Sequence, residues 1–251
     1  MINIVIPMAG EGSRFSSAGY KTPKPFLPIH GLEMISAVIQ NLRPAAEHRF
    51  ILLTRRGHDE YLSKVVDRAS KDNSKTEIIF VDELTEGAAC TVLLAREFID
   101  NNDELMIANS DQWVDIDINE YLSVMHVDEI DGVVMTMTAN DPKWSFCEIN
   151  QSGEITRIVE KEVISNVATV GIYNFKKGCD FVSAADSMIS QNLRVNGEFY
   201  VAPVYNQLIL QGKKFLPWGV GEEGAGMYGL GIPSDFEAFI ANPISQKASK
   251  L

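Results

Sequence analysis

Short apolar runs alternate with helix-like stretches along almost the whole chain. Turn-forming residues bound the runs, as they bound the buried strands of a parallel sheet. The longer stretches between the runs have the length of helices that cross back over such a sheet. The predicted strands cover 2–6, 49–53, 77–81, 104–108, 132–138, 145–149, 154–159 and 168–175, and the predicted helices cover 34–42, 58–69, 88–99, 177–190 and 198–211.

This alternation predicts an α/β fold built on a doubly wound, mostly parallel sheet. Strands follow one another closely between 132 and 175, which predicts a small antiparallel or mixed extension of that sheet. Ligands of such sheets bind beyond the carboxyl ends of the strands. We therefore look for chemistry where the predicted strands end.

Bulk composition changes this picture little. The chain has 251 residues, is 45% hydrophobic and carries a formal net charge of −12, which opposes non-specific binding to nucleic acid. We see no apolar run of membrane-spanning length and no signal peptide, so we expect no membrane partner and a cytoplasmic location. Cys90, Cys147 and Cys179 are widely separated, and we expect reduced, buried thiols.

The first predicted strand runs directly into a glycine-rich loop. Two glycines let the backbone approach a ligand closely and turn its N–H groups toward a phosphate. The loop lacks both the Gly-Lys-Ser/Thr ending of a Walker A loop and the glycine spacing of a dinucleotide-binding loop. The alternative is a tight turn without a ligand. The candidate phosphate-binding residues are Met8, Ala9, Gly10, Glu11, Gly12 and Ser13.

Two cations follow this loop. The guanidinium of Arg14 would clamp phosphate oxygens in bidentate fashion, whereas the ammonium of Lys24 is a compact charge suited to a transferring phosphoryl group. The alternative is that both are solvated surface charges. Lys24 precedes Pro25, and this pairing after a glycine-rich loop makes the whole string more specific than its glycines.

Asp111 follows the predicted strand 104–108 and is placed to bind a metal ion. A carboxylate at a strand terminus is a hard oxygen ligand that suits Mg²⁺ bridging to nucleotide phosphates. The alternative is that Asp111 caps the next segment. Asp115 and Asp117 lie close behind it and are either surface charges or a metal-binding Asp-x-Asp pair.

Small residues after the predicted strand 77–81 are suited to contact with a nucleobase. Thr85, Glu86, Gly87 and Ala88 precede the predicted helix 88–99, and a flat ring can approach the backbone there. A carboxylate accepts a hydrogen bond from an exocyclic amine such as cytosine N4 and repels the O4 of uracil or thymine. Glu86 therefore favours CTP. The alternative is an ordinary strand-to-helix connection with a cap.

Taken together, residues 2–31 resemble the N-terminal signature of the sugar-phosphate nucleotidylyltransferases, written G-G-x-G-[ST]-R followed by K-P. Ala9 stands in place of the first glycine. The resemblance implies a Rossmann-like, GT-A-like sheet over one domain, 1–251, with a nucleotide-binding half of about 1–130 and an acceptor-binding half of about 131–251. It also implies pyrophosphorylase-type transfer of NMP from an NTP with Mg²⁺, with catalytic roles for Arg14 and Lys24.

The same resemblance implies an acceptor site in the second half. Lys161 would bind the acceptor phosphate, Glu160 a polar group, and the backbone of Gly171 would line the pocket. Glu198, in a Gly-Glu segment, would contact the acceptor as well. Without the resemblance, Glu160 and Lys161 read as an exposed, charged strand end. Aromatic candidates for this pocket are Trp144, Phe146, Tyr173 and Phe199.

Several positions depart from the family pattern. Thr85 and Glu86 replace an upstream Gln, Ser110 replaces a Gly, and Gly229 replaces the Asp that serves as second metal ligand. The chain is similar to a branch associated with modification of capsule or surface polysaccharides, in which some members are cytidylyltransferases. The expected acceptor is a sugar 1-phosphate or a phosphorylated amino-acid derivative.

Two other functions are weighed against this one. A nucleotide-sugar glycosyltransferase would use Asp115 and Asp117 to bind its metal, and it would release a nucleoside diphosphate. A non-catalytic nucleotide sensor is the second alternative, because Gly229 removes a metal ligand. The sequence leaves the oligomeric state open, a homo-oligomer included.

Overall fold

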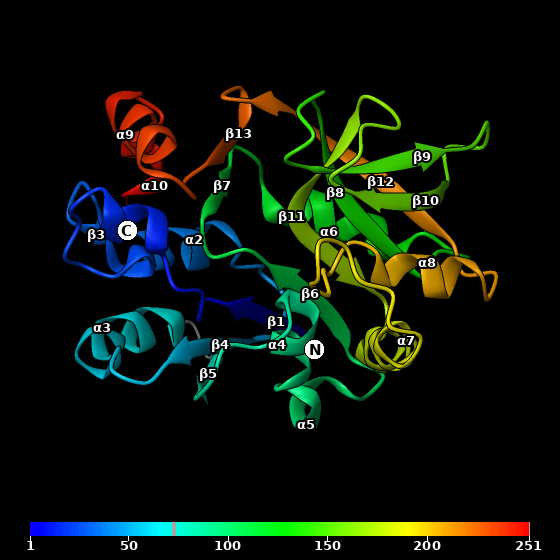
Figure 1. Ribbon diagram of the computed structural model, residues 1–251, viewed down its shortest axis with the longest axis horizontal. Helices are drawn as coiled ribbons and strands as arrows, with labels where there is room; N and C mark the ends of the chain where they lie inside the picture. The colour runs from blue at the N-terminus through cyan, green and yellow to red at the C-terminus, as the bar shows by residue number, and fades with distance from the viewer. Residues whose placement is uncertain (72–73, 251) are drawn as a thin grey trace.

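A twisted sheet runs through the computed structural model, which describes residues 1–71 and 74–250 (Figure 1). Within these residues the sheet has eleven strands, in the order β5-β4-β1-β6-β11-β8-β12-β13-β7, with β9 and β10 attached beside β11. A separate pair is formed by β2 (Pro28–Ile29) and β3 (Leu32–Glu33). The main strands are β1 (Ile2–Pro7), β4 (His48–Arg55), β5 (Lys75–Val81), β6 (Glu104–Ala108), β7 (Gln112–Val114), β8 (Gly132–Thr138), β9 (Ser145–Ile149), β10 (Ile155–Glu160), β11 (Val167–Phe175), β12 (Phe215–Glu223) and β13 (Gly226–Gly229).

The first four of these neighbours, β5, β4, β1 and β6, are parallel, and the strand predictions for all four are confirmed. Val5 at the centre of β1 lies opposite Ile51 of β4 and Ile107 of β6. Both faces of β1 are covered, so its residues are buried in near-continuous sequence, as in other parallel sheets. These strands therefore end together at one edge of the sheet.

The extension predicted between 132 and 175 is present. Strand β11 runs antiparallel to both β6 and β8, and β9 and β10 form an antiparallel pair beside it. Strand β12 adds to β8 in parallel, and β13 pairs with β7. The predicted α/β fold with a mostly parallel sheet and a mixed extension is thus confirmed.

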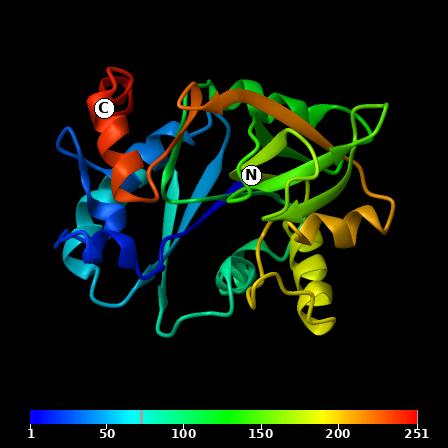
Figure 2. The same cartoon turned by 45° about the horizontal axis from the view of Figure 1, so that its top comes forward.

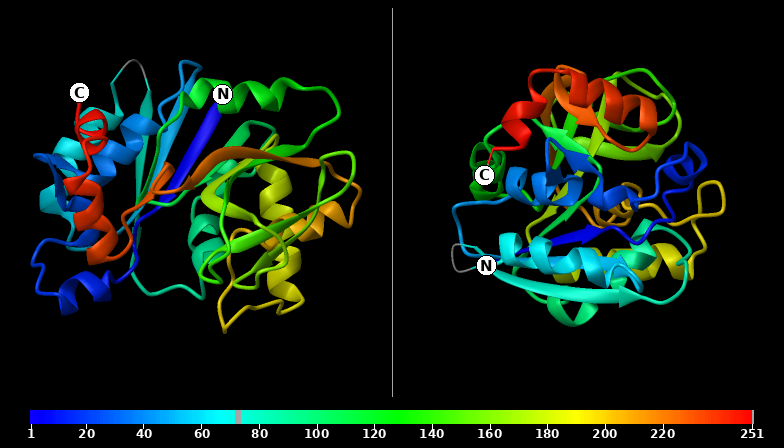
Figure 3. Two further views of the ribbon diagram at one scale, coloured as in Figure 1. Left: turned by 90° about the horizontal axis from the view of Figure 1, so that it is seen from above. Right: turned by 90° about the vertical axis from the view of Figure 1, so that its left-hand side faces the viewer.

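Helices cover both faces of the sheet (Figure 3). Apolar residues of α2, α3 and α6 pack on one face with Ile4 and Ile6 of β1, and residues of α4, α5, α7 and α8 pack on the other with Val5. The helices are α1 (Ser13–Ser17), α2 (Met34–Asn41), α3 (Asp59–Ala69), α4 (Ala88–Leu93), α5 (Arg96–Ile99), α6 (Ile118–Ser123), α7 (Gly178–Ser190), α8 (Val204–Ile209), α9 (Pro233–Ala241) and α10 (Ser245–Ala248), with 3₁₀ turns η1 (Lys24–Phe26) and η2 (Val124–His126).

A third cluster joins the two ends of the chain. In Figure 2 the C-terminal helices lie beside the N-terminal segments. Phe236 and Phe239 of α9 pack there with Phe15 of α1 and Trp113 of β7. The residues after 226 therefore brace the segment that carries the glycine-rich loop.

Two helix predictions are partly wrong. The predicted helix 88–99 is interrupted, because Leu94 and Ala95 donate to carbonyls three residues back and the chain turns between α4 and α5. The predicted helix 198–211 is helical only at 204–209, since the backbone of Phe199 pairs with the 84–89 loop instead. Among the described residues, no helix is long and apolar enough to cross a membrane.

Candidate active site

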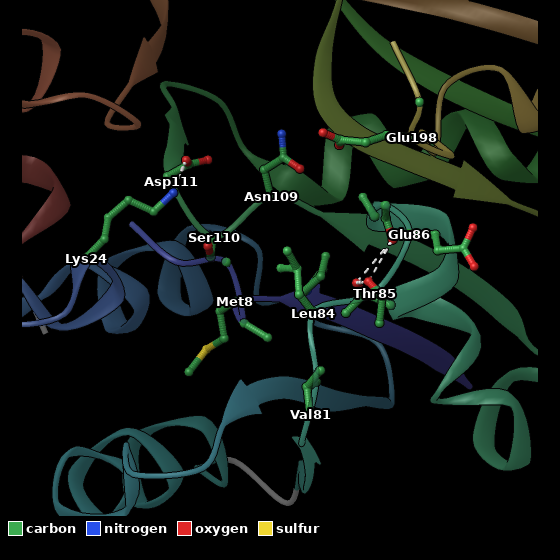
Figure 4. Close-up of a pocket in the computed structure, with 17 residues that line it drawn as sticks. Met8, Lys24, Val81, Leu84, Thr85, Glu86, Asn109, Ser110, Asp111 and Glu198 are labelled. Atoms are coloured by element: carbon green, nitrogen blue, oxygen red, sulfur yellow. Dashed lines mark hydrogen bonds and ion pairs between the residues drawn. The ribbon is translucent and has the colours of Figure 1, made fainter. Parts of the chain in front are cut away.

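A cavity of about 540 Å³ lies at the carboxyl ends of β1, β5 and β6 (Figure 4). Its walls come from residues 7–10 after β1, 84–88 after β5, 109–111 after β6, and 197–198 of the second half, together with Lys24. This is the edge at which ligands of doubly wound sheets bind. The segments predicted to contact the phosphates, the nucleobase and the metal are therefore brought together here.

A short ion pair in this cavity joins Lys24 and Asp111. The ammonium nitrogen of Lys24 lies 2.6 Å from Oδ2 of Asp111, and the two side chains are 20% and 22% exposed. Gly12, with φ +62°, packs against Lys24, because a Cβ at this position would lie 3.3 Å from the Cβ of Lys24. The glycine-rich loop thus helps to aim the lysine into the cavity.

Only the first part of the glycine-rich loop lines the cavity. Met8, Ala9 and Gly10 form its wall, whereas 11–14 do not. In residues 1–71 and 74–250 no hydrogen bond uses the backbone N–H groups of Ala9, Gly10 or Glu11. These three donors are free to bind an anion, and their contact with a phosphate stays a prediction.

The catalytic prediction for Arg14 lacks support from this geometry. Arg14 lies in α1, which begins right after Gly12, and its side chain is exposed. Its neighbour Phe15 is buried in the third core cluster, and this fixes the helix with Arg14 outside the cavity wall. Arg14 makes no ion pair with any described residue. Its contact with a ligand stays a prediction.

The side chains predicted to read a nucleobase, those of Thr85 and Glu86, make hydrogen bonds or ion pairs with other residues of the protein. The hydroxyl of Thr85 donates to the carbonyl of Gly87 at 3.1 Å and lies 2.6 Å from that of Thr91. The carboxylate of Glu86 points away from the cavity and pairs with Arg194 (Figure 4 shows its direction). The argument for CTP from Glu86 gains no support from this structure, because one oxygen of the carboxylate is held by a guanidinium.

Gly87 is required where it stands. It has φ +135°, and a Cβ added to it would lie 2.4 Å from the carbonyl oxygen of Phe199. We expect Gly87→Ala to lower the free energy of unfolding by about 2 kcal/mol or more. Chemical denaturation measures this. Gly57→Ala is the control, since Gly57 also has a positive φ but nothing within 4 Å of its Cβ position. Equal losses in both variants would contradict the close contact.

A second cavity of about 280 Å³ adjoins the first, and Ala88 and Asn109 line both. Lys161 lies in its wall with φ +58°, a conformation that non-glycine residues seldom adopt. Its ammonium donates to the hydroxyl of Tyr200 and lies 4.5 Å from the centre of that ring. The hydrogen bond to Tyr200 contributes most to raising the pKa of Lys161, so a cation is held in this cavity.

Glu160 is the buried acid of the second cavity. It is 9% exposed and accepts a hydrogen bond from the hydroxyl of Ser145. Burial raises the pKa of Glu160, while Ser145 and Lys161 act against this rise. The cavity thus offers an acid whose proton is held more tightly than in water.

This pKa shift makes the stability depend on pH. Because the pKa of Glu160 is raised in the folded state from its ordinary 4.5, its stabilising contribution is complete below 4.5 and is lost as pH rises through the folded pKa. We expect the stability of Glu160→Gln, compared with that of the parent, to increase from pH 5 to pH 8, because the parent loses the contribution of Glu160 over this range and the variant does not. Melting temperatures at both pH values measure this. Glu148→Gln, at a 55% exposed side chain of β9, should show no such change; a pH-independent difference for Glu160→Gln would contradict the shift.

The other two predicted acceptor residues, Gly171 and Glu198, line different cavities. Gly171 lines the second cavity, but its N–H donates to Oε1 of Gln112 at 2.7 Å. A Cβ on Gly171 would lie 1.9 Å from Nδ2 of Asn109, so only glycine fits. Glu198 lines the first cavity instead of the second (Figure 4). Of the aromatic candidates, Trp144 and Tyr173 line the second cavity, while Phe146 and Phe199 are buried core residues.

The sequence pattern of the nucleotidyl transferase family matches residues 4–196, which is more than half of the chain. The chain belongs to this family. A curated relative is the bifunctional protein GlmU of Methanococcus maripaludis, 26% identical over 179 residues, which are 70% of this chain and 40% of that protein. A putative mannose-1-phosphate guanyltransferase of Sulfolobus acidocaldarius is 23% identical over 70% of this chain and 49% of its own. The chain spans less than half the length of these relatives.

Two solved structures have the same fold. A nucleoside-diphosphate-sugar pyrophosphorylase of Vibrio cholerae superposes with a TM-score of 0.77 at 25% identity, covering 95% of this chain and 100% of its own. An inositol-1-phosphate CTP transferase of T. maritima superposes with a TM-score of 0.73 at 16% identity, covering 99% and 96%. The latter likeness shows the fold alone.

The family likeness raises the question of how a metal would be held. Asp111 offers a carboxylate at the end of β6, beside Gly231, where a Cβ would lie 2.9 Å from its Oδ2. The missing side chain leaves room next to a hard oxygen ligand, and this fits Mg²⁺. Among the described residues there is no group of three or more His, Cys, Asp or Glu that could hold a metal. Asp111 therefore fits as a single protein ligand, with substrate oxygens and water completing the shell.

Gly229 occupies the place at which the family resemblance implies a second ligand. A Cβ added there would have ordinary contacts, 3.7 Å to Oδ2 of Asp235 and 3.9 Å to Oε1 of Glu223. Glu223 pairs with Lys143 at 2.8 Å. A Cβ at position 229 would therefore meet no clash, and the departure at Gly229 does not come from crowding.

Both carboxylates of the Asp-x-Asp alternative, Asp115 and Asp117, make structural contacts. Asp115 pairs with Lys247 of α10, and Asp117 caps α6 by accepting from the N–H of Asn119. That backbone hydrogen bond is the main cause that lowers the pKa of Asp117. Neither carboxylate lines the two cavities described above. This geometry gives no support to a glycosyltransferase metal site.

Several polar residues of the site region were not predicted, and Lys143, Tyr200 and Arg194 are among them. Lys143 and Tyr200 line the second cavity, and Arg194 pairs with Glu86 in the wall of the first. Lys143 precedes β9, and Arg194 and Tyr200 lie in the loop after α7. No short sequence motif marks any of these three residues. An aromatic residue two places after the predicted Glu198 is the one available signal, and it indicates a substrate contact only after the pocket is known.

Proposed function

We propose that this protein transfers the NMP group of an NTP to the phosphate of a small phosphorylated acceptor of the sugar 1-phosphate class, with release of pyrophosphate. The observation that carries the proposal is the Lys24–Asp111 pair, 2.6 Å apart, in a cavity that shares Ala88 and Asn109 with a second cationic cavity. Two adjoining sites, each with a lysine, suit two phosphorylated substrates. The 1–130 half would supply most nucleotide contacts and the 131–251 half most acceptor contacts.

The reaction needs no protein nucleophile. An oxygen of the acceptor phosphate forms a bond to the α-phosphorus, the bond from that phosphorus to the bridging oxygen breaks, and the electron pair leaves with pyrophosphate. The work of the protein is to position the substrates and to stabilise developing negative charge. Lys24 would follow charge on the transferring group, and the free N–H groups of Ala9, Gly10 and Glu11 would bind the β- and γ-phosphates.

We propose Mg²⁺ as the metal, with Asp111 as its protein ligand. When bound, Mg²⁺ would neutralise phosphate oxygens and orient the triphosphate. In the present structure Asp111 binds Lys24 instead, so the two groups form a neutral pair. With a magnesium triphosphate complex bound, Lys24 would contact phosphate oxygens and Asp111 would contact Mg²⁺ in place of their contact with each other. Each group would then still have a counter-charge.

For the acceptor, Lys161 would bind the phosphate, and Glu160 would bind a polar group farther in. The support is that both line the second cavity, one as a cation held by Tyr200 and one as a buried acid. A sugar hydroxyl and the amine of a phosphorylated amino-acid derivative are both partners for such an acid. CTP is kept as a candidate nucleotide on the sequence resemblance, without a role for the Glu86 carboxylate.

Pyrophosphate release tests this function. The protein with Mg²⁺ would be given ATP, CTP, GTP, UTP and dTTP in turn, each against sugar 1-phosphates and phosphorylated amino-acid derivatives. Release that requires one NTP and one acceptor supports the proposal and names both substrates. Release of a nucleoside diphosphate from a nucleotide sugar, or NTP binding without turnover over the whole panel, would contradict it and favour a glycosyltransferase or a sensor.

A further inference from the structure

One segment of the second half forms part of both cavities. Residues 197–198 line the first cavity and Tyr200 lines the second. Between them Phe199 is 1% exposed and is bound to the loop after β5 in both directions. Its N–H donates to the carbonyl of Glu86 at 2.9 Å, and its carbonyl accepts from the N–H of Ala89 at 3.0 Å. The two walls therefore meet along a short backbone pairing.

The side chain of Arg194 makes several contacts that stabilise this backbone pairing. Its guanidinium lies 4.1 Å from the ring centre of Phe199, donates through Nε to Asn192 at 2.7 Å and through Nη1 to the carbonyl of Gly197 at 3.0 Å. Its Nη2 pairs with the carboxylate of Glu86, 108 residues away in sequence. A planar guanidinium can make these contacts at once, whereas an ammonium cannot. The side chain of Arg194 is 31% exposed, less than half the 64% of Glu86.

We propose that Arg194 is a positioning residue for nucleotide binding, which holds Glu86 and thereby fixes residues 84–88 against residues 197–200. The proposal rests on the proposed function, since it assumes that the first cavity binds an NTP. Glu86 then acts on the nucleotide through Arg194 and the backbone, and not by reading the base. The charge-assisted contact sets the position of Gly87 and Ala88, whose backbone lines the cavity.

Positioning and base reading give different results when the pair is broken. If the pair only positions the wall, removing either partner weakens every NTP by a similar factor. If Glu86 reads the base, its removal changes the ratio of the affinities for CTP and UTP, because these bases present a donor and an acceptor at the same place. In that case Arg194 has little influence on binding.

Isothermal titration of CTP, UTP, GTP, ATP and dTTP with Mg²⁺ separates the two. We expect Arg194→Gln and Glu86→Gln each to raise the Kd of every NTP that the parent binds by about tenfold, with the ratios between NTPs unchanged. The double variant Glu86→Arg with Arg194→Glu should recover part of the lost affinity, because it restores the ion pair in reverse but not the hydrogen bonds to Asn192 and Gly197. A merely structural arginine would not give this rescue.

Controls keep the outcome clear. Arg96→Gln breaks a comparable pair with Asp186 that lies outside both cavities, and it should leave every Kd unchanged. Arg194→Lys keeps the charge and replaces Arg194→Gln if that variant does not fold; we expect an intermediate loss. An altered CTP to UTP ratio in Glu86→Gln, with no effect of the Arg194 variants, would overturn the proposal. Failure of the parent to bind any NTP would instead overturn the proposed function.

Discussion

Replacing Lys24 with Ala is expected to lower kcat by about 10²–10³-fold, the usual loss when one preorganised charge at a reacting centre is removed. The ammonium is the one cation that lines the first cavity in the described chain, and it lies 2.6 Å from the carboxylate proposed to hold Mg²⁺. Without it, charge on the transferring phosphoryl group has no side-chain counterpart on that side. Because both partners are about one-fifth exposed, we expect the free energy of unfolding to change by no more than about 1–2 kcal/mol.

Lys21→Ala is the matched control for this substitution. Lys21 is exposed and lies three residues before Lys24, outside the cavity wall. Steady-state pyrophosphate release gives kcat for both variants, and circular dichroism shows whether each is folded. A folded Lys24→Ala variant with kcat within a few-fold of the parent would contradict the assigned role.

Replacing Asp111 with Asn is expected to have a comparable effect, a fall in kcat of about 10²–10³-fold. Asn has nearly the same shape, so it fits in the place of Asp111 beside Gly231. It lacks the charge that a hard divalent cation requires. The variant should also need a higher Mg²⁺ concentration for half-maximal binding of the NTP, which titration calorimetry measures independently of turnover.

Asp115→Asn is the control for the metal assignment. Asp115 pairs with Lys247 and does not line the cavity, so this variant should keep kcat and its Mg²⁺ dependence. The comparison also tests the glycosyltransferase alternative, which places the metal on Asp115 and Asp117. Loss of Mg²⁺ dependence in Asp115→Asn with retention in Asp111→Asn would reverse the assignment.

The parallel half of the fold was predictable because its signal is local. In β1 and β6 continuous apolar runs mark strands buried on both faces, and the strand ends mark the edge where the ligand cavity lies. That rule placed Gly10 and Asp111 at one edge before any contact was known, and the motif after the loop added Lys24. The structure places these three residues in one cavity.

The parts that were missed depend on partners far away in sequence. Strand β12 contains Pro217, Gly219 and Gly221, which interrupt the strand pattern, yet it pairs with β8 over most of that strand. Strand β13 exists because it pairs with β7. The 198–203 segment has a helical pattern but is not helical, because Phe199 pairs with the 84–89 loop. Local propensity is overruled in each case by a contact across the fold.

The same limit applies to Glu86. A carboxylate next to a glycine after a strand is a sound candidate for base recognition when it is considered alone. The direction of the side chain is decided by Arg194, which no spacing rule connects with it. Arg14 shows the complementary case, since its motif is clear but the burial of Phe15 leaves it outside the cavity wall. Motifs locate segments better than they orient side chains.

The fate of labelled phosphate tests the central claim most directly. The protein would be given its NTP and acceptor with Mg²⁺, once with the NTP labelled at the α-phosphate and once at the γ-phosphate, and the products would be separated. The account predicts the α-label in the acceptor product and the γ-label in pyrophosphate, with both transfers reduced together in Lys24→Ala. A γ-label on the acceptor, or an α-label released as NMP without acceptor product, would contradict it.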